Sequence, residues 1–122
     1  MNEEEKKILT VPEDGDDENS AEALGDFAYT LSKPLAWEGE TYSELHFKFG
    51  SLTGKQVLDI MRDMRLRGIN VAAKQFDMEY QYRYAAACCV EGIDPNAIAS
   101  LPERDFDAIC SRAQRFLVRS VL

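Results

Sequence analysis

Two runs of alternating hydrophobic and polar residues lie between residues 27 and 49. Their apolar members are Phe27, Tyr29 and Leu31, followed by Leu45, Phe47 and Phe49. A period of two is typical of strands that bury one face. Between the runs lie Glu38 and Gly39, and glycine readily adopts the positive φ of a tight turn. The pattern predicts a half-buried β-hairpin whose first strand is interrupted, or lies at an edge, at Pro34, which cannot donate a ladder hydrogen bond.

After residue 50 the apolar residues take a helical spacing. Thr53 and Gln56 match a capping box, so they predict the start of a first helix, which ends near Gly68. Its expected apolar stripe is Val57, Ile60, Met61 and Met64. Asp94 and Pro95 predict the start of a short helical turn. A last helix is expected from about Pro102 onward, with the buried residues Phe106, Ile109, Cys110, Ala113, Phe116 and Leu117.

A second helix is expected from about Lys74 to Glu91, ended by Gly92. One expected apolar face holds Phe76, Tyr80, Tyr84, Ala87 and Cys88. A second face, offset by two residues and so roughly opposite, holds Met78, Tyr82, Ala85 and Cys89. Because a small domain has few elements to cover both faces, we expect one of them to meet a partner or a second copy of the chain.

The order of these elements predicts an α+β fold, in which an N-terminal β-hairpin is followed by three main α-helices. An isolated hairpin is only marginally stable in water, so it must pack on the helices or on another subunit. A homo-oligomer is therefore one option.

Residues 1–26 differ in composition from residues 27–122. They hold ten of the 22 acidic residues and two of the 14 basic ones, which accounts for the net charge of −8. With few large apolar residues, they are expected to form a disordered acidic tail before a single α+β domain. The tail is interpreted either as a solubilising segment or as a docking strand at "KKILTV" whose acidic part covers a basic site.

The electrically balanced domain argues against a nucleic-acid-binding protein, which needs a surplus of lysine and arginine. No apolar run approaches the ~18–20 residues of a membrane span, so no membrane partner is expected. The three cysteines include an adjacent pair, Cys88 and Cys89, and all lie in predicted helices. They are expected to be reduced core thiols, which favours a cytosolic protein.

Catalytic and ligand-binding patterns are missing from the sequence. The single histidine, His46, falls on the polar face of a predicted strand, where a surface role is expected. The cysteines lack metal-site spacing, and "GSLTGK" at residues 50–55 lacks the spacing of a phosphate-binding loop. The sequence therefore predicts no enzymatic activity, no metal and no cofactor.

Three arginines of the last predicted helix fall at spacings of three and four residues. Arg112, Arg115 and Arg119 form a basic stripe opposite the apolar side of that helix. Such a stripe is either a solvated face or a surface that receives the acidic tail or an acidic partner segment.

Two stretches of the sequence resemble a known family. They are "YTLSKPLAWEGETYSELHFKFGSLTGKQVLDI" at residues 29–60 and "AAACCVEGIDPNAIASLPERDFDAICSRAQRFL" at residues 85–117. Together they resemble the tail assembly chaperones of Mu-like, contractile-tailed phages and prophages, over about residues 27–120. The matching positions are Leu31, Ser32, Lys33 and Pro34, then Gly92, Ile98, Leu101, Asp105 and Phe106.

The resemblance implies a binding protein that acts during virion morphogenesis in the cytoplasm of the bacterial host. Proteins of the family bind the tape measure protein, keep it soluble and recruit tail tube subunits, and they are not retained in the virion. Met78, Tyr82 and Cys89 are then expected on the surface that binds the client or a second copy. The alternatives are a structural virion component, such as a tail completion or connector subunit, and a small acidic regulatory or inhibitor protein.

Overall fold

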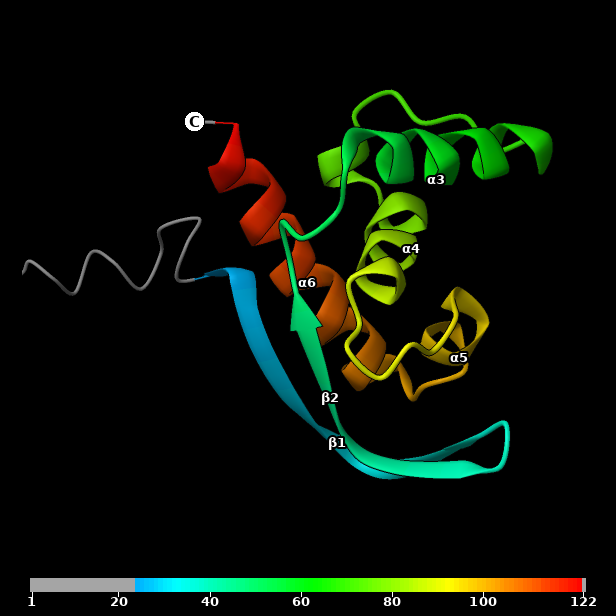
Figure 1. Ribbon diagram of the computed structural model, residues 1–122, viewed down its shortest axis with the longest axis vertical. Coiled ribbons are helices and arrows are strands. Elements are labelled where there is room, and N and C mark those ends of the chain that lie inside the picture. Colours follow the sequence, from blue (N-terminus) through cyan, green and yellow to red (C-terminus); the bar gives the residue numbers. More distant parts are fainter. Residues whose placement is uncertain (1–23, 122) are drawn as a thin grey trace, which may run out of the picture.

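A β-hairpin followed by helices makes up the computed structural model, which describes residues 24–121 (Figure 1). The predicted α+β fold class is confirmed. Its elements are β1 (Asp26–Trp37), β2 (Glu40–Lys48), α3 (Gly54–Leu66), the 3₁₀ turn η2 (Lys74–Phe76), α4 (Met78–Ala87), α5 (Pro95–Ala99) and α6 (Glu103–Ser120).

Residues 1–23 of the predicted acidic tail lie outside the residues that the structure describes. Its last three expected residues, 24–26, belong instead to the folded domain. Leu24 is only 1% exposed, and the carbonyl of Gly25 accepts a 2.7 Å hydrogen bond from the amide of Phe49. The domain therefore begins at least three residues earlier than predicted, because the chain is already paired and packed there.

The hairpin turn has the predicted conformation. Trp37 pairs with Glu40, and both intervening residues have positive φ, 49° at Glu38 and 85° at Gly39. Such a two-residue turn matches the right-handed twist of the strands that it joins. The expected interruption at Pro34 is also present, as an irregularity in the register between Thr30 and Leu35, after which β1 continues.

The free edge of β2 is partly covered by the residues that follow α4. Lys48 donates its amide to the carbonyl of Cys88 at 2.9 Å, and Val90 donates to the carbonyl of His46 at 2.7 Å. Backbone groups engaged with a strand cannot continue a helical ladder, so α4 ends at Ala87. The prediction of a helix reaching Glu91 is wrong for this reason.

The start of the second helix also differs from the prediction. Asp77 has an extended backbone, and its carboxylate accepts a hydrogen bond from the amide of Glu79. An aspartate that caps in this way begins a helix. Residues 74–76 are therefore a separate 3₁₀ turn, and α4 runs only from Met78 to Ala87.

Aromatic rings connect the hairpin to the helices inside the core. The ring of Phe49 lies 5.7 Å from that of Phe47, 5.9 Å from that of Tyr84 and 5.9 Å from that of Phe116. The Tyr84 hydroxyl also accepts a 2.8 Å hydrogen bond from the amide of Gly50. Phe49 therefore joins β2, α4 and α6 at one point, and Figure 1 shows the hairpin running along α6.

The three cysteines are free and buried, as predicted. Burial is the main cause that raises the pKa of the Cys89 thiol to about 11 and that of the Cys110 thiol to about 12. These thiols are neutral at physiological pH and serve as small core residues.

Candidate partner-binding surface

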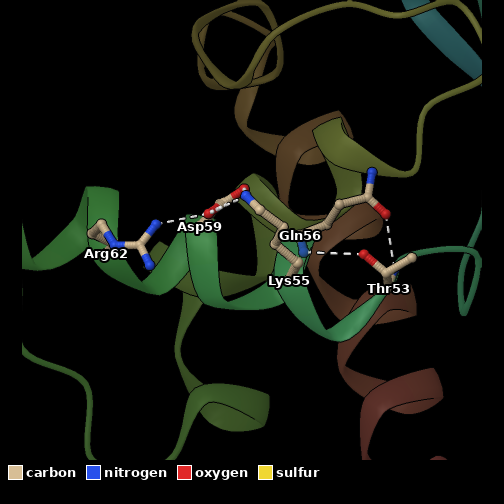
Figure 2. Close-up of polar contacts among 5 residues, drawn as sticks. All are labelled: Thr53, Lys55, Gln56, Asp59 and Arg62. Atoms are coloured by element: carbon tan, nitrogen blue, oxygen red, sulfur yellow. Dashed lines mark hydrogen bonds and ion pairs between the residues drawn. The ribbon is translucent and has the colours of Figure 1, made fainter.

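Helix α3 has a capping box and ion pairs within itself. The Thr53 side chain accepts a hydrogen bond from the amide of Gln56, whose side chain accepts one from the amide of Thr53 (Figure 2). The predicted capping box is thus confirmed. In the same view the Asp59 carboxylate pairs with Lys55 at 3.2 Å and with Arg62 at 2.8 Å, which lowers the pKa of Asp59.

Contacts between α3 and the rest of the domain are limited. Met64 is the one residue of the helix that is fully buried, at 1% exposure. The other members of the predicted stripe, Val57, Ile60 and Met61, pack against the core but stay partly accessible. The apolar face of α3 is therefore only partly covered by its own domain.

Two grooves flank α3. One lies between α3 and residues 69–72, has a volume of about 470 Å³, and includes Met61, Met64 and Val71 in its lining. We call it the loop-side groove. The other, the α5-side groove, has a volume of about 360 Å³ and lies between α3, α4 and the start of α5. Each groove includes residues of the predicted stripe, Met61 and Met64 in the first and Ile60 in the second.

The α5-side groove has a lining of both apolar and charged residues. The apolar ones include Ile60, Ala86 and Ile93, and the charged ones are Asp59, Asp63, Arg83 and Asp94. Asp63 is paired with Arg67 at 2.8 Å, and Asp94 caps α5. A lining that mixes apolar and charged side chains suits an amphipathic segment.

Two leucines of α3 are exposed outside the stripe. Leu58 is 59% exposed and Leu66 is 82% exposed. Single exposed leucines are common, but these two stand on the helix that already separates two grooves. The exposed leucines and the two grooves together form what we call the α3 surface.

The three residues predicted on one face of the second helix do not share a surface. Met78, the first residue of α4, is 44% exposed. Tyr82 is half-buried, and its ring lies 5.4 Å from that of Phe106. Cys89 lies after the helix, is 8% exposed and forms a bridge with Phe47. The expectation that Cys89 faces a partner is wrong, because β2 and the core cover it.

The basic stripe lies on α6, as predicted, but its members differ in environment. The guanidinium of Arg112 stacks over the ring of Phe27 at 4.6 Å and donates to the carbonyl of Asp26 at 3.3 Å. Burial is the main cause that lowers its pKa, and the charge of Arg115 adds to the effect. Arg115 and Arg119 are exposed. Only part of the stripe is a solvated face.

Asp105 ties α6 to the hairpin. Its side chain is buried and accepts hydrogen bonds from the Tyr29 hydroxyl at 2.7 Å, the Ser32 hydroxyl at 2.8 Å and the Ser32 amide at 3.1 Å. Burial alone would raise the pKa of Asp105, but these hydrogen bonds outweigh it and the pKa is lowered.

A second polar contact joins β2 to the segment after α4. Glu91 accepts a 2.9 Å hydrogen bond from the amide of His46 and lies 2.6 Å from its Nδ1. The hydrogen bond with Glu91 raises the pKa of His46. His46 is about half-exposed, so its predicted surface position is confirmed.

Within residues 24–121, no group of three or more His, Cys, Asp or Glu side chains could hold a metal ion. Over the same residues, no helix is long and apolar enough to cross a membrane.

Comparison of the chain with known proteins found no matching family model, no similar curated protein and no similar solved structure. The function is therefore argued from the residues and their arrangement.

The α3 surface was missed because the sequence shows only a stripe, not how much of it is covered. One signal was present. Leu58 and Leu66 fall outside the stripe, on sides of the helix where polar residues are usual. Apolar residues at such positions indicate a helix with more than one covered side.

Proposed function

We propose that this protein is a non-catalytic binding protein, a tail assembly chaperone that holds the tape measure protein in solution. It acts during tail morphogenesis in the cytoplasm of a bacterial host, recruits tail tube subunits and is not retained in the virion. One observation carries the proposal. Helix α3 has one fully buried side chain, Met64, and lies between two grooves whose linings include apolar residues.

The chemistry of the α3 surface suits a helical client. An amphipathic helix that binds in a groove buries residues spaced three and four apart. Both grooves run beside α3, whose own apolar residues have this spacing. Fully burying one exposed leucine contributes about 1.5–3 kcal/mol to binding before the cost of ordering. Met61, which is partly exposed in the lining of the loop-side groove, can adapt its shape to different segments of a long client.

The resemblance to tail assembly chaperones supports the choice of client. Its two motifs lie far apart in the sequence, yet Ser32 of the first and Asp105 of the second are joined by hydrogen bonds. These positions thus hold the hairpin against α6. They account for the fold, whereas client binding is assigned to the α3 surface.

Co-expression with the tape measure protein of the same gene cluster tests the proposal. The tape measure protein is expected to stay in the soluble fraction and to co-elute with this chain. A Leu58→Glu, Leu66→Glu double variant should lose the complex and stay folded, because both side chains are already exposed. The matched control is a Val90→Glu, Val121→Glu double variant, which places the same two charges outside α3 at apolar positions that are 59% and 69% exposed.

Two results would count against the proposal. In the first, the tape measure protein pellets beside a soluble wild-type chain. In the second, the α3 double variant and the control bind equally well, which would place the client elsewhere. Mass spectrometry of purified particles then separates a chaperone, which should be missing from them, from a structural virion component.

A further inference from the structure

Polar contacts treat α3 differently from the other elements. Its side chains form their hydrogen bonds and ion pairs within residues 53–67, and in the part of the chain that the structure describes none of them joins α3 to another helix or strand. By contrast, Asp105 of α6 is bonded to Ser32 of β1, and the Gln81 side chain of α4 donates to that of Gln114 of α6 at 3.0 Å. Helix α3 is held by apolar contacts, mainly with α4, at the margin of the domain (Figure 1).

Both ends of α3 are closed by residues next to them in the sequence. Thr53 and Gln56 form the capping box at its start. At its end Gly68 has a φ of 79°, and the amide of Ile69 donates a 2.9 Å hydrogen bond to the carbonyl of Met64. Neither end of the helix therefore depends on contacts with the rest of the domain.

The connections of α3 are unequal. Residues 51–53 link its start to β2, whereas residues 67–73, which form no helix or strand, link its end to η2. The longer connection would span about 24 Å if fully extended. Its apolar residues Ile69 and Val71 are only partly buried, so it adds no fully buried anchor. The geometry of the connections thus allows α3 to pivot about its N-terminal end.

Movement of α3 away from α4 uncovers two apolar surfaces that face each other. One includes Ala86 and Ile93, which line the α5-side groove. The other is the stripe of α3 itself, Val57, Ile60, Met61 and Met64. Because α3 packs on α4 through this stripe, the uncovered surface accepts a helix whose apolar residues lie three, four and seven positions apart. An amphipathic helix of the client has that spacing.

We propose that α3 separates from α4 while the rest of the domain stays folded, and that a helical segment of the client enters between the two helices. The inference rests on the proposed function for the identity of the client. It adds that the two grooves beside α3 are the closed form of one larger site. The client is then bound by α4 on one side and by the stripe of α3 on the other.

Hydrogen exchange of the full chain without a client tests the separation. An isolated helix of 13 residues is marginally stable in water, so α3 loses amide protection once it leaves α4. Amides of residues 58–66 should be at least about 10-fold less protected than those of residues 109–116 in α6, and low urea should change only the latter. Equal protection and equal urea dependence in the two helices would overturn the proposal.

A cross-link between α3 and α4 distinguishes separation from local fraying. Asp59 and Ala87 line the same groove from opposite helices and are accessible, so an Asp59→Cys, Ala87→Cys variant can be joined by a bis-maleimide, while the native thiols are buried. The cross-link should slow the exchange of residues 58–66 at least about 10-fold. The same variant treated with N-ethylmaleimide is the matched control and should exchange as the wild type does. Unchanged exchange in the cross-linked protein would count against the separation.

The same two preparations test the entry of the client. Tape measure protein diluted from urea should stay in solution with the N-ethylmaleimide-treated protein and pellet with the cross-linked one. If both keep it in solution, the client does not need α3 to move and the proposal is wrong. If neither does, the proposed client is refuted, whereas the exchange measurements still decide whether α3 separates from α4.

Discussion

The contact of Asp105 with the hairpin can be tested by removing its carboxylate. The buried side chain accepts three hydrogen bonds, from Tyr29 and twice from Ser32. Hydrogen bonds to charged groups contribute about 1.5–3 kcal/mol each, and a buried donor left without a partner costs about 1–3 kcal/mol. Because the three share one acceptor group they do not add fully, so Asp105→Ala should lower the free energy of unfolding by about 3–5 kcal/mol.

Asp105→Asn should be much milder. The amide oxygen can accept from Ser32, and the amide nitrogen can donate to the Tyr29 hydroxyl, which also accepts. All the polar groups then keep partners, and the loss of charge should cost about 1–2 kcal/mol. The order of the two variants distinguishes a polar network from a side chain that only fills space.

The pH dependence gives a second measurement on the same group. The pKa of Asp105 is lowered in the folded state from its ordinary value of 3.8. Its contribution to stability is therefore fully present above pH 3.8 and is lost as the pH falls through the lower folded value. The Asn variant lacks this group, so its stability should fall less than that of the wild type on acidification.

Urea unfolding, followed by two signals, measures these changes. Fluorescence of Trp37, the single tryptophan, reports on the far end of the hairpin, and far-ultraviolet circular dichroism reports on the helices. The two transitions should coincide if the domain unfolds in one step. Equal losses for Asp105→Ala and Asp105→Asn, or a loss below about 1 kcal/mol for the alanine variant, would refute the reasoning.

Three further predictions concern packing, titration and thiol access. Gly50→Ala should lower the free energy of unfolding by about 2–4 kcal/mol, because its φ is 90° and its new Cβ would lie 2.8 Å from the ring of Phe116. Gly68→Ala, with a φ of 79° and open space around it, is the matched control and should cost about 1 kcal/mol in urea unfolding. The pKa of His46, followed by its ring proton signals, should lie above 6.5 and fall in Glu91→Gln; an unchanged value would contradict the contact. The three native cysteines should react with a thiol reagent only after unfolding, and fast reaction of the folded protein would show that they are accessible.

Local signals in the sequence determined most of the elements. The alternation of apolar residues predicted both strands, and Gly39 placed the turn. The capping box at Thr53 placed the start of α3, and Gly68 placed its end. Each of these features depends on residues within a few positions of one another, so the sequence contains the whole physical cause.

Features that depend on distant residues were decided by the tertiary structure. The end of α4 is set by the edge of β2, some 40 residues earlier in the sequence, and the same contact buries Cys89. The role of Asp105 depends on Ser32, which is 73 residues away. No periodicity shows such pairings, because they arise only when the hairpin folds onto the helices.

The candidate partner-binding surface also depends partly on local sequence and partly on contacts between distant residues. The stripe of α3 and the basic stripe of α6 are visible in the sequence, since helical spacing places their members on one face. How far each stripe is covered depends on what packs against it. Met64 is buried while Leu66 is 82% exposed, and Arg112 lies against Phe27 while Arg119 is exposed. The sequence determined which faces exist, and packing decided which of them remain accessible to a partner.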